Sequence, residues 1–261
     1  MSRHSPIPVS LGGGCDVSLY LLAPRKLTPA NEFFDHLWNL DRGLVDVRRI
    51  IETDFAGFDR PENYVRRHHP EWNTPEKPGR VRLAARDMDT QQVVHAAYPD
   101  IAFIHWPDVQ ELPVRFARKA SRFRALLRGD RPLSFIYYRK CDCAAHGRYL
   151  VNEDLDVQAK LTLLAEESVA FAECIRSRFP ELRFHLLAGF MEARRRHPKV
   201  DAAVDAFFAA APDTDDVTYR RLRCRGDRDW QERWIALERD FARADGRREP
   251  TSRWRSPRVS T

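Results

Sequence analysis

Apolar runs alternate with helical patterns along most of the chain. Continuously apolar segments predict strands that are buried on both faces, and they occur at residues 7–11, 101–106, 133–138, 184–190 and 217–222. Apolar residues at intervals of three and four predict amphipathic helices, and these patterns cover residues 44–55, 115–127, 153–178, 204–208 and 230–241. Buried strands separated by helices are typical of a mostly parallel sheet with helices on both faces, so the expected fold class is α/β.

Two parts of the chain fall outside this alternation. Residues 61–98 begin with a proline-rich excursion, and alternation in residues 80–83 and 92–95 predicts a β-hairpin around Met88-Asp89. Residues 246–261 hold five arginines and one glutamate, so this tail carries +4 of the net charge of +6 and leaves +2 elsewhere. We therefore expect one α/β domain over residues 1–245 and a disordered basic tail over residues 246–261.

Composition narrows the classes of function. A nearly neutral body without a stripe of basic and aromatic residues argues against a specific nucleic-acid partner. No apolar run reaches the roughly 18 residues of a membrane span or forms the core of a secretory leader. The five cysteines are an odd number, which does not suit a disulfide framework, so the expected compartment is a reducing cytoplasm.

The main candidate for chemistry is Cys15, which ends the glycine loop Ser10-Leu11-Gly12-Gly13-Gly14-Cys15. An apolar strand precedes this loop and a helical pattern follows it, so we expect Cys15 at a helix N-terminus. The helix dipole and the unpaired amides there favour the thiolate and lower the pKa of the thiol. The backbone N–H groups of Gly13 and Gly14 are suited to an oxyanion hole. The structural alternative is a small buried cysteine in a tight turn.

A nucleophilic cysteine needs a base, and His105 is the preferred candidate among nine histidines because it ends an apolar strand. The carboxylate that orients this base is either Asp35, which lies among aromatic residues, or Asp142, which follows the next strand. Arg139 and Trp106 also lie at strand ends, where ligands of parallel sheets bind, so both are expected substrate contacts.

Two other kinds of site are less well matched by the residues. Cys141, Cys143 and His146 are metal-type ligands, but a closed zinc site needs a fourth, so no metal or other cofactor is expected. Gly12-Gly13-Gly14 lacks the spacing of a dinucleotide fingerprint and the lysine of a P-loop. It still leaves an alternative function, in which a transferase or binding module holds a phosphorylated or nucleotide-sugar ligand at this loop and at Arg139. A third possibility is a non-catalytic interaction protein.

Several segments together form a recognisable pattern. They are residues 10–15, residues 34–39, Asp54-Phe55-Ala56-Gly57-Phe58, Phe103-Ile104-His105, the basic helix with Arg118 and Arg122, the strand ending at Arg139 and a tryptophan-bearing last helix. This pattern resembles a bacterial domain-of-unknown-function family described as papain-like cysteine peptidases.

The resemblance implies a catalytic set with Cys15 as nucleophile, His105 as base and Asp35 as the acidic residue. It also implies an activity, which is hydrolysis or transfer of an amide, ester or thioester acyl group on a small-molecule or peptidyl substrate. A papain-like α+β fold is the corresponding alternative to the α/β fold that periodicity predicts. The sequence departs from the pattern where His36, rather than an aromatic residue, follows Asp35, and where the arginine-rich tail is added.

Overall fold

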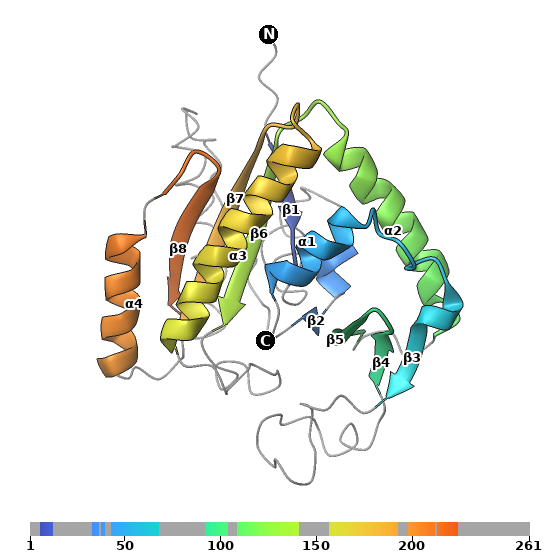
Figure 1. Cartoon of the computed structure of the whole chain (residues 1–261), viewed down its shortest axis with the longest axis horizontal. Helices are drawn as coiled ribbons and strands as arrows, with labels where there is room; N and C mark the ends of the chain where they lie inside the picture. The colour runs from blue at the N-terminus through green and yellow to red at the C-terminus, as the bar shows by residue number, and fades with distance from the viewer. Residues whose placement is uncertain are drawn as a thin grey trace, which may run out of the picture.

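The computed structural model describes residues 6–12, 33–36, 38–39, 43–67, 92–103, 109–140, 157–192, 198–211 and 213–223. Within these ranges the chain forms two four-stranded sheets and the helices that pack beside them (Figure 1). None of the helices in these ranges has the length and apolarity needed to cross a membrane.

The first sheet is parallel throughout and has the strand order β1-β6-β7-β8. Its strands are β1 (Ile7–Ser10), β6 (Leu133–Lys140), β7 (Phe184–Glu192) and β8 (Val217–Arg223). Residues 133–139 of β6 and 186–190 of β7 are buried on both faces, as continuous apolar runs predict. The expectation of a mostly parallel sheet is therefore confirmed, and the fold is broadly α/β.

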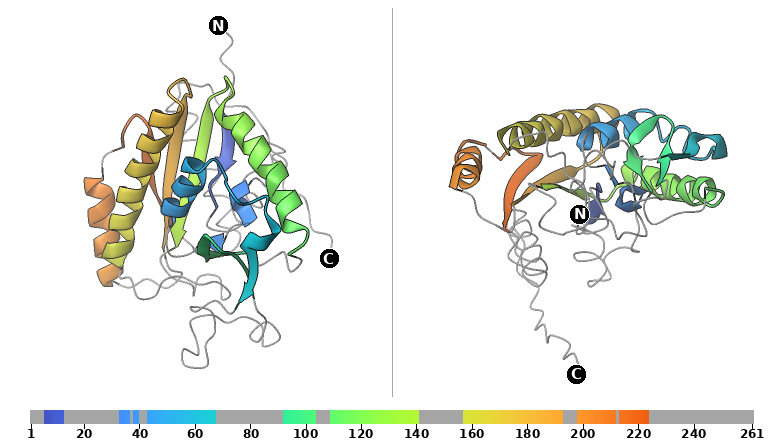
Figure 2. Two further views of the ribbon diagram at one scale, coloured as in Figure 1. Left: turned by 45° about the vertical axis from the view of Figure 1, so that its right-hand side comes forward. Right: turned by 90° about the horizontal axis from the view of Figure 1, so that it is seen from below.

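The helices that connect these strands lie on one face of the sheet. Helix α3 (Val157–Arg178) connects β6 to β7, and α4 (Pro198–Ala210) connects β7 to β8. Both connections move one place along the sheet in the same direction, and right-handed crossovers then put both helices on the same face. Figure 2 shows this layer, with α1 (Leu44–Glu52) beside α3. Helices on the opposite face stay a prediction, because residues 224–245 lie outside the described residues.

The second sheet is antiparallel and has the order β2-β5-β4-β3. Its strands are β2 (Trp38–Asn39), β5 (Tyr98–Ala102), β4 (Gln92–His95) and β3 (Tyr64–Arg67), the last preceded by the 3-10 helix η4 (Pro61–Asn63). The apolar run at residues 101–106 was expected in the parallel sheet, and this expectation is wrong. Ile101 and Ala102 belong to β5 and pair antiparallel with β2, because an apolar run indicates burial but not the partner strand.

The hairpin also differs from the sequence-based expectation. Strand β4 pairs with β3 along one edge and with β5 along the other. A strand has only two edges, so residues 80–83 are not the hairpin partner of residues 92–95. The tight hairpin instead joins β4 to β5 through Ala96 and Ala97, and residues 80–83 lie outside the described residues.

An aromatic core joins the second sheet to α2 (Leu112–Leu127). The ring of Phe33, in the 3-10 helix η3 (Phe33–His36), lies 4.8 to 5.2 Å from those of Phe55, Phe58 and Phe116. The predicted inward face of α2 is confirmed, because all four of its members are buried: Phe116, Ala120, Phe123 and Leu127. Lys119, a basic residue of the same helix, is buried as well.

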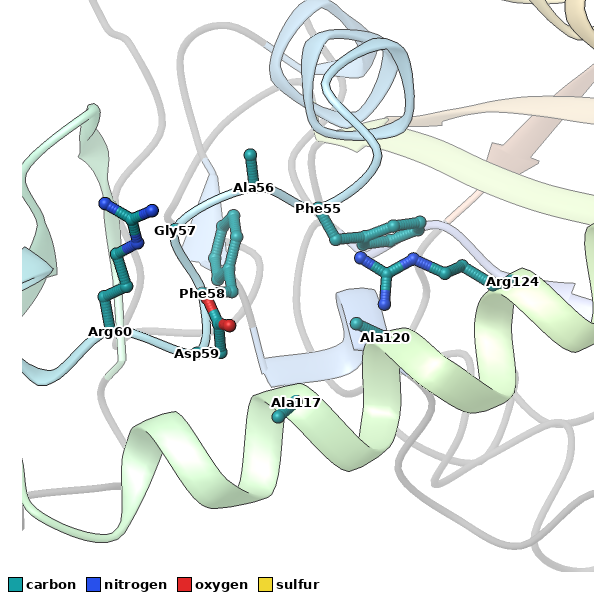
Figure 3. Close-up of a pocket in the computed structure, with 9 residues that line it drawn as sticks. All are labelled: Phe55, Ala56, Gly57, Phe58, Asp59, Arg60, Ala117, Ala120 and Arg124. Carbon is teal, nitrogen blue, oxygen red and sulfur yellow. The ribbon is translucent and has the colours of Figure 1, made fainter.

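The turn that follows α1 packs against α2 and leaves a small pocket between them (Figure 3). Asp54 and Phe55 both have positive φ, at 51° and 59°, a conformation that is costly for residues other than glycine. Arg124 holds this turn, because its Nε donates to the Asp54 carboxylate at 2.9 Å and its guanidinium lies over the Phe55 ring. The pocket has a volume of about 260 Å³.

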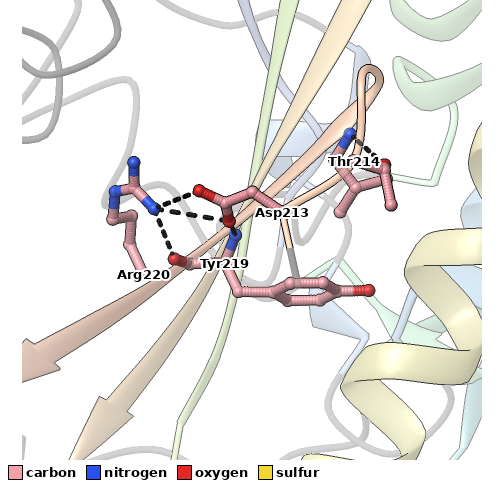
Figure 4. A network of polar contacts seen from close by, with 5 residues as sticks. Asp213, Thr214, Tyr219 and Arg220 are labelled. Carbon is pink, nitrogen blue, oxygen red and sulfur yellow. Dashed lines mark hydrogen bonds and ion pairs between the residues drawn. The ribbon is translucent and has the colours of Figure 1, made fainter. Parts of the chain in front are cut away.

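A polar network fixes the start of β8, which is the last strand of the parallel sheet (Figure 4). The Tyr219 backbone N–H donates to the Asp213 carboxylate at 3.0 Å, and Arg220 pairs with the same carboxylate at 3.1 Å. The Thr214 hydroxyl accepts from the backbone N–H of Val217. Side chains thus satisfy backbone groups on the edge of β8 that faces away from β7, which protects an edge strand from unwanted pairing.

Candidate functional site

The glycine loop begins at Gly12, which lies directly against η3. Gly12 has a φ of +89°, and a Cβ built on it would lie 2.5 Å from the carbonyl oxygen of Phe34. Its N–H donates to the Ser10 hydroxyl, and the Leu11 N–H continues the β1–β6 pairing to Ile136. Only glycine allows this backbone approach without strain. The structure therefore explains why position 12 is a glycine.

The segment that leads to His105 is held by contacts with β2, β4 and α2. Ala102, three residues before His105, pairs with Trp38, three residues after Asp35. Phe103 is buried, its N–H donates to the Val93 carbonyl, and its ring lies 5.1 Å from that of Phe116. Phe33, two residues before Asp35, lies 5.2 Å from the same Phe116 ring. The segments leading to Asp35 and to His105 therefore lie side by side.

The residues predicted for catalysis lie within a few positions of the contacts just described. Asp35 lies in η3, where its backbone is described. Five others lie outside the described residues: Gly13, Gly14, Cys15, His105 and Trp106. Cys15 is three residues beyond Gly12, and His105 is three residues beyond Ala102, and three residues span at most about 11 Å. Chain connectivity therefore limits how far each candidate lies from the contacts just described.

Arg139 is described, and its side chain is buried. Its Nη1 donates to the Glu167 carboxylate of α3 at 3.3 Å, and the two side chains are 5% and 4% exposed. Arg139 is the last buried residue described on β6, near the carboxyl end of the sheet as expected. In this arrangement it bridges a strand and a helix, so contact with a substrate stays a prediction.

Glu167 also closes the start of α1. The Leu44 N–H donates to Glu167 Oε2 at 3.1 Å. The N-cap residue of α1 is Gly43, which has no side chain to cap the helix. Gly43 has a φ of +53°, and a Cβ there would meet Glu167 Oε2, the Tyr137 hydroxyl and Arg139 Nη1 at 2.3, 2.5 and 2.7 Å. Three polar side chains thus converge on one glycine, and we call Tyr137, Arg139 and Glu167 the Gly43 cluster.

Burial dominates the electrostatics of this cluster. Loss of solvent raises the pKa of Glu167 to about 7, against the opposing effects of Arg139 and the Leu44 N–H. Burial also raises the pKa of Tyr137, so its phenol stays neutral. The Glu167 carboxyl therefore changes protonation near neutral pH, at a position where it holds two elements together.

The sequence analysis did not single out Glu167, although a signal was present. Glu167 is three residues after Leu164 and four before Phe171, so it falls on the apolar face of α3. A charge on a buried face requires a partner. The matching partner was Arg139, near the end of a buried strand.

His95 is a second buried titratable residue, and its role is structural. Its ring stacks on Phe58 at 4.3 Å, and its Nδ1 accepts from the Ala97 N–H at 3.2 Å. The proton is therefore on Nε2, which donates to the Gly57 carbonyl at 3.3 Å. Burial lowers the pKa of His95, so a neutral imidazole ties β4 to the turn after α1.

No group of three or more His, Cys, Asp or Glu side chains arranged to hold a metal occurs among the residues that the structure describes. Cys141, Cys143 and His146, together with Asp142, lie outside them.

No family model matches the chain, and no curated protein or solved structure shows significant similarity to it. The papain-like resemblance therefore rests on the residues alone.

Proposed function

We propose that this protein is a cysteine-dependent hydrolase or acyltransferase, with Cys15 as nucleophile, His105 as base and Asp35 as the residue that orients the base. Its substrate is a small molecule or peptide that carries an amide, ester or thioester. A reducing cytoplasm suits this chemistry, because the thiol stays free there.

The observation that carries the proposal is the contact between Gly12 and Phe34. Gly12 leads into the loop that ends at Cys15, and Phe34 is adjacent to Asp35. The pairing of Trp38 with Ala102 brings the third segment, which leads to His105, to the same part of the molecule. Gly12 and Phe34 are 22 residues apart along the chain, and Trp38 and Ala102 are 64 apart, so segments distant in sequence converge, which is what a catalytic constellation requires.

The proposed reaction has two steps. In the first, His105 takes the proton of the Cys15 thiol, and the sulfur attacks the acyl carbon to form a C–S bond. The N–H groups of Gly13 and Gly14 stabilise the oxyanion. The bond to the leaving amine, alcohol or thiol then breaks, and His105 returns the proton to that group. In the second step, water or an amine attacks the thioester, releases the product and regenerates the thiol.

The experiment that tests the proposal compares Cys15 with Cys174 in one protein. Burial raises the pKa of Cys174 to about 11, so its thiolate is scarce at neutral pH. An activated Cys15 is expected to react with iodoacetamide faster than Cys174, with an apparent pKa below the free value of about 8.5. Mass mapping of the alkylated peptides measures both rates. Equal or slower labelling of Cys15 would contradict the hypothesis that its thiol is activated.

Turnover identifies the chemistry. A panel of peptides, esters and thioesters is assayed with the wild-type protein and with Cys15→Ala. We expect turnover of at least one acyl class that Cys15→Ala abolishes. Turnover that survives in Cys15→Ala would exclude the cysteine as nucleophile.

The alternative, a module that holds a phosphorylated or nucleotide-sugar ligand at the glycine loop and Arg139, is supported less well. The Arg139 side chain is 5% exposed and already paired with Glu167. An anionic ligand would have to displace that carboxylate and enter a buried position.

A further inference from the structure

The pocket between the turn after α1 and helix α2 is formed by residues other than those proposed for acyl transfer. Its walls are residues 55–60 of the turn and three residues of α2. Two of the three are the short side chains of Ala117 and Ala120, and the third is Arg124. A longer side chain at Ala117 would occupy this space, so the sequence of α2 keeps the pocket open.

The apolar wall of the pocket belongs to the aromatic core. Phe55 and Phe58 line the pocket, and their rings lie 4.8 and 5.0 Å from that of Phe33. The backbone of this wall is strained, because Asp54 and Phe55 both have positive φ. Such residues cost about 1–3 kcal/mol each and are concentrated at binding and active sites. Packing therefore holds the turn in a conformation that its residues do not favour on their own.

Arg124 brings to the pocket a guanidinium that is already held in place. Its Nε and Nη2 donate to the carboxylate and the backbone carbonyl of Asp54, and the group lies over the Phe55 ring. Its Nη1 makes no hydrogen bond or ion pair within the part of the chain that the structure describes, and the side chain is 32% exposed. A fixed guanidinium with free N–H groups binds a carboxylate without ordering a further side chain.

Asp59 adds the opposite charge to the same pocket. Its carboxylate has no ion pair or hydrogen bond with any described residue. Figure 3 shows the Asp59 carboxylate and the Arg124 guanidinium on the side of the turn that faces α2, whereas Arg60 extends away from Arg124. A simple anion bound to Arg124 would be repelled by Asp59, and a simple cation bound to Asp59 would be repelled by Arg124. A ligand that carries both charges avoids both repulsions.

We propose that this pocket binds a free α-amino acid with an apolar side chain, whose carboxylate pairs with Arg124 and whose ammonium group pairs with Asp59. The apolar side chain of the ligand packs against Phe55, Phe58 and Ala117. The pocket volume of about 260 Å³ is just below the roughly 300 to 1,000 Å³ of pockets for drug-sized ligands, which suits a ligand of this size. Binding involves no covalent step and does not depend on Cys15.

Three probes with the same carbon skeleton test the site. They are L-leucine, 4-methylpentanoate, which lacks the amino group, and 3-methylbutylamine, which lacks the carboxylate. Titration of the full chain, followed by the amide NMR signals of Gly57, Asp59 and Ala120, gives a dissociation constant for each probe. We expect L-leucine to shift these signals and to bind at least about tenfold more tightly than either other probe, because each of those loses one charge-assisted contact. Unshifted signals with L-leucine overturn the proposal, and so does equal binding of the acid or the amine.

Two variants test the lining directly. Ala117→Leu fills the pocket and should abolish binding of L-leucine, whereas Ala125→Leu, the same change at an exposed alanine of α2 outside the pocket, should leave binding unchanged. Asp59→Asn keeps the size of the side chain and removes its charge, so it should weaken L-leucine at least about tenfold without weakening 4-methylpentanoate. Unchanged binding of L-leucine in folded Ala117→Leu or Asp59→Asn overturns the proposal.

The comparison of the three probes in the wild type decides the question even where a variant does not fold. The same titration in Cys15→Ala separates this site from the proposed active site. Turnover should be lost in that variant, while L-leucine should still shift the signals of Gly57, Asp59 and Ala120.

Discussion

The carbonyl oxygen of Phe34 lies 2.5 Å from the position that a Cβ on Gly12 would occupy. Gly12→Ala is therefore expected to destabilise the protein, because alanine must adopt a costly φ there and its Cβ must push the Gly12 backbone away from Phe34 of η3. We expect the free energy of unfolding to fall by at least about 2 kcal/mol. Urea denaturation followed by circular dichroism measures this change.

Gly129→Ala is the matched control for this substitution. Gly129 follows α2, and a Cβ there would meet its nearest atoms, backbone carbonyls, at 3.3 and 3.4 Å without a positive φ. Its effect should be small. An equally small effect of Gly12→Ala would show that η3 does not rest on the glycine loop, and it would weaken the convergence that supports the active site.

Cys15 and His105 are expected to act as one unit. Cys15→Ala and His105→Ala should each abolish nearly all turnover of the acyl substrate that the panel identifies, and the double variant should be little worse than either, since groups that act together lose activity non-additively. The measurement is kcat/KM for the three variants. Normal turnover in folded His105→Ala would show that His105 is not the base, and His36 or His146 would become the candidate.

Asp35→Asn is expected to reduce kcat less than loss of His105, because an orienting carboxylate fixes the tautomer of the base without reacting itself. Rate and melting temperature should be measured on the same preparation. A melting temperature lowered by several degrees with an unchanged rate would assign Asp35 to the folding of η3, and Asp142 would become the orienting candidate.

The stability of the protein should fall as pH rises from about 4.5 to about 7 through the titration of Glu167. The folded state raises the pKa of this carboxyl to about 7, so it holds the proton over a range in which the unfolded chain has lost it. Stability is then fully present below the unfolded value and is lost as pH passes the folded value. The difference is about 3 kcal/mol. Denaturation midpoints at several pH values should show this slope, and Glu167→Gln should lack it.

Asp213→Ala is expected to reduce the free energy of unfolding by about 1 kcal/mol, because it removes the hydrogen bond to the Tyr219 N–H and the contact with Arg220. Asp215→Ala, a change at an exposed neighbour outside this network, should have little effect. Thermal unfolding of both variants gives the comparison. Equal effects would mean that the network in Figure 4 does not stabilise β8.

Local sequence patterns were sufficient for the elements themselves. Residues 133–138 and 184–190 form strands of the parallel sheet, and the apolar positions of α2 face the core as predicted, because periodicity records which side of an element meets the core. The same patterns could not assign residues 101–102 to a sheet. Apolar character is the same whichever strand is the neighbour, and pairing is decided by where distant segments meet.

The sequence by itself predicted a mostly parallel α/β sheet, a glycine loop before Cys15 that suits a tight turn, and candidate chemistry at Cys15 and His105, with Asp35 or Asp142 as the orienting carboxylate. Only the tertiary structure decided that Gly12 rests on Phe34, that β5 belongs to the antiparallel sheet, and that Arg139 pairs with Glu167. The physical reason is that propensity and periodicity act over a few neighbouring residues. The partner of a buried charge is fixed by packing between elements, here 28 residues apart in the chain.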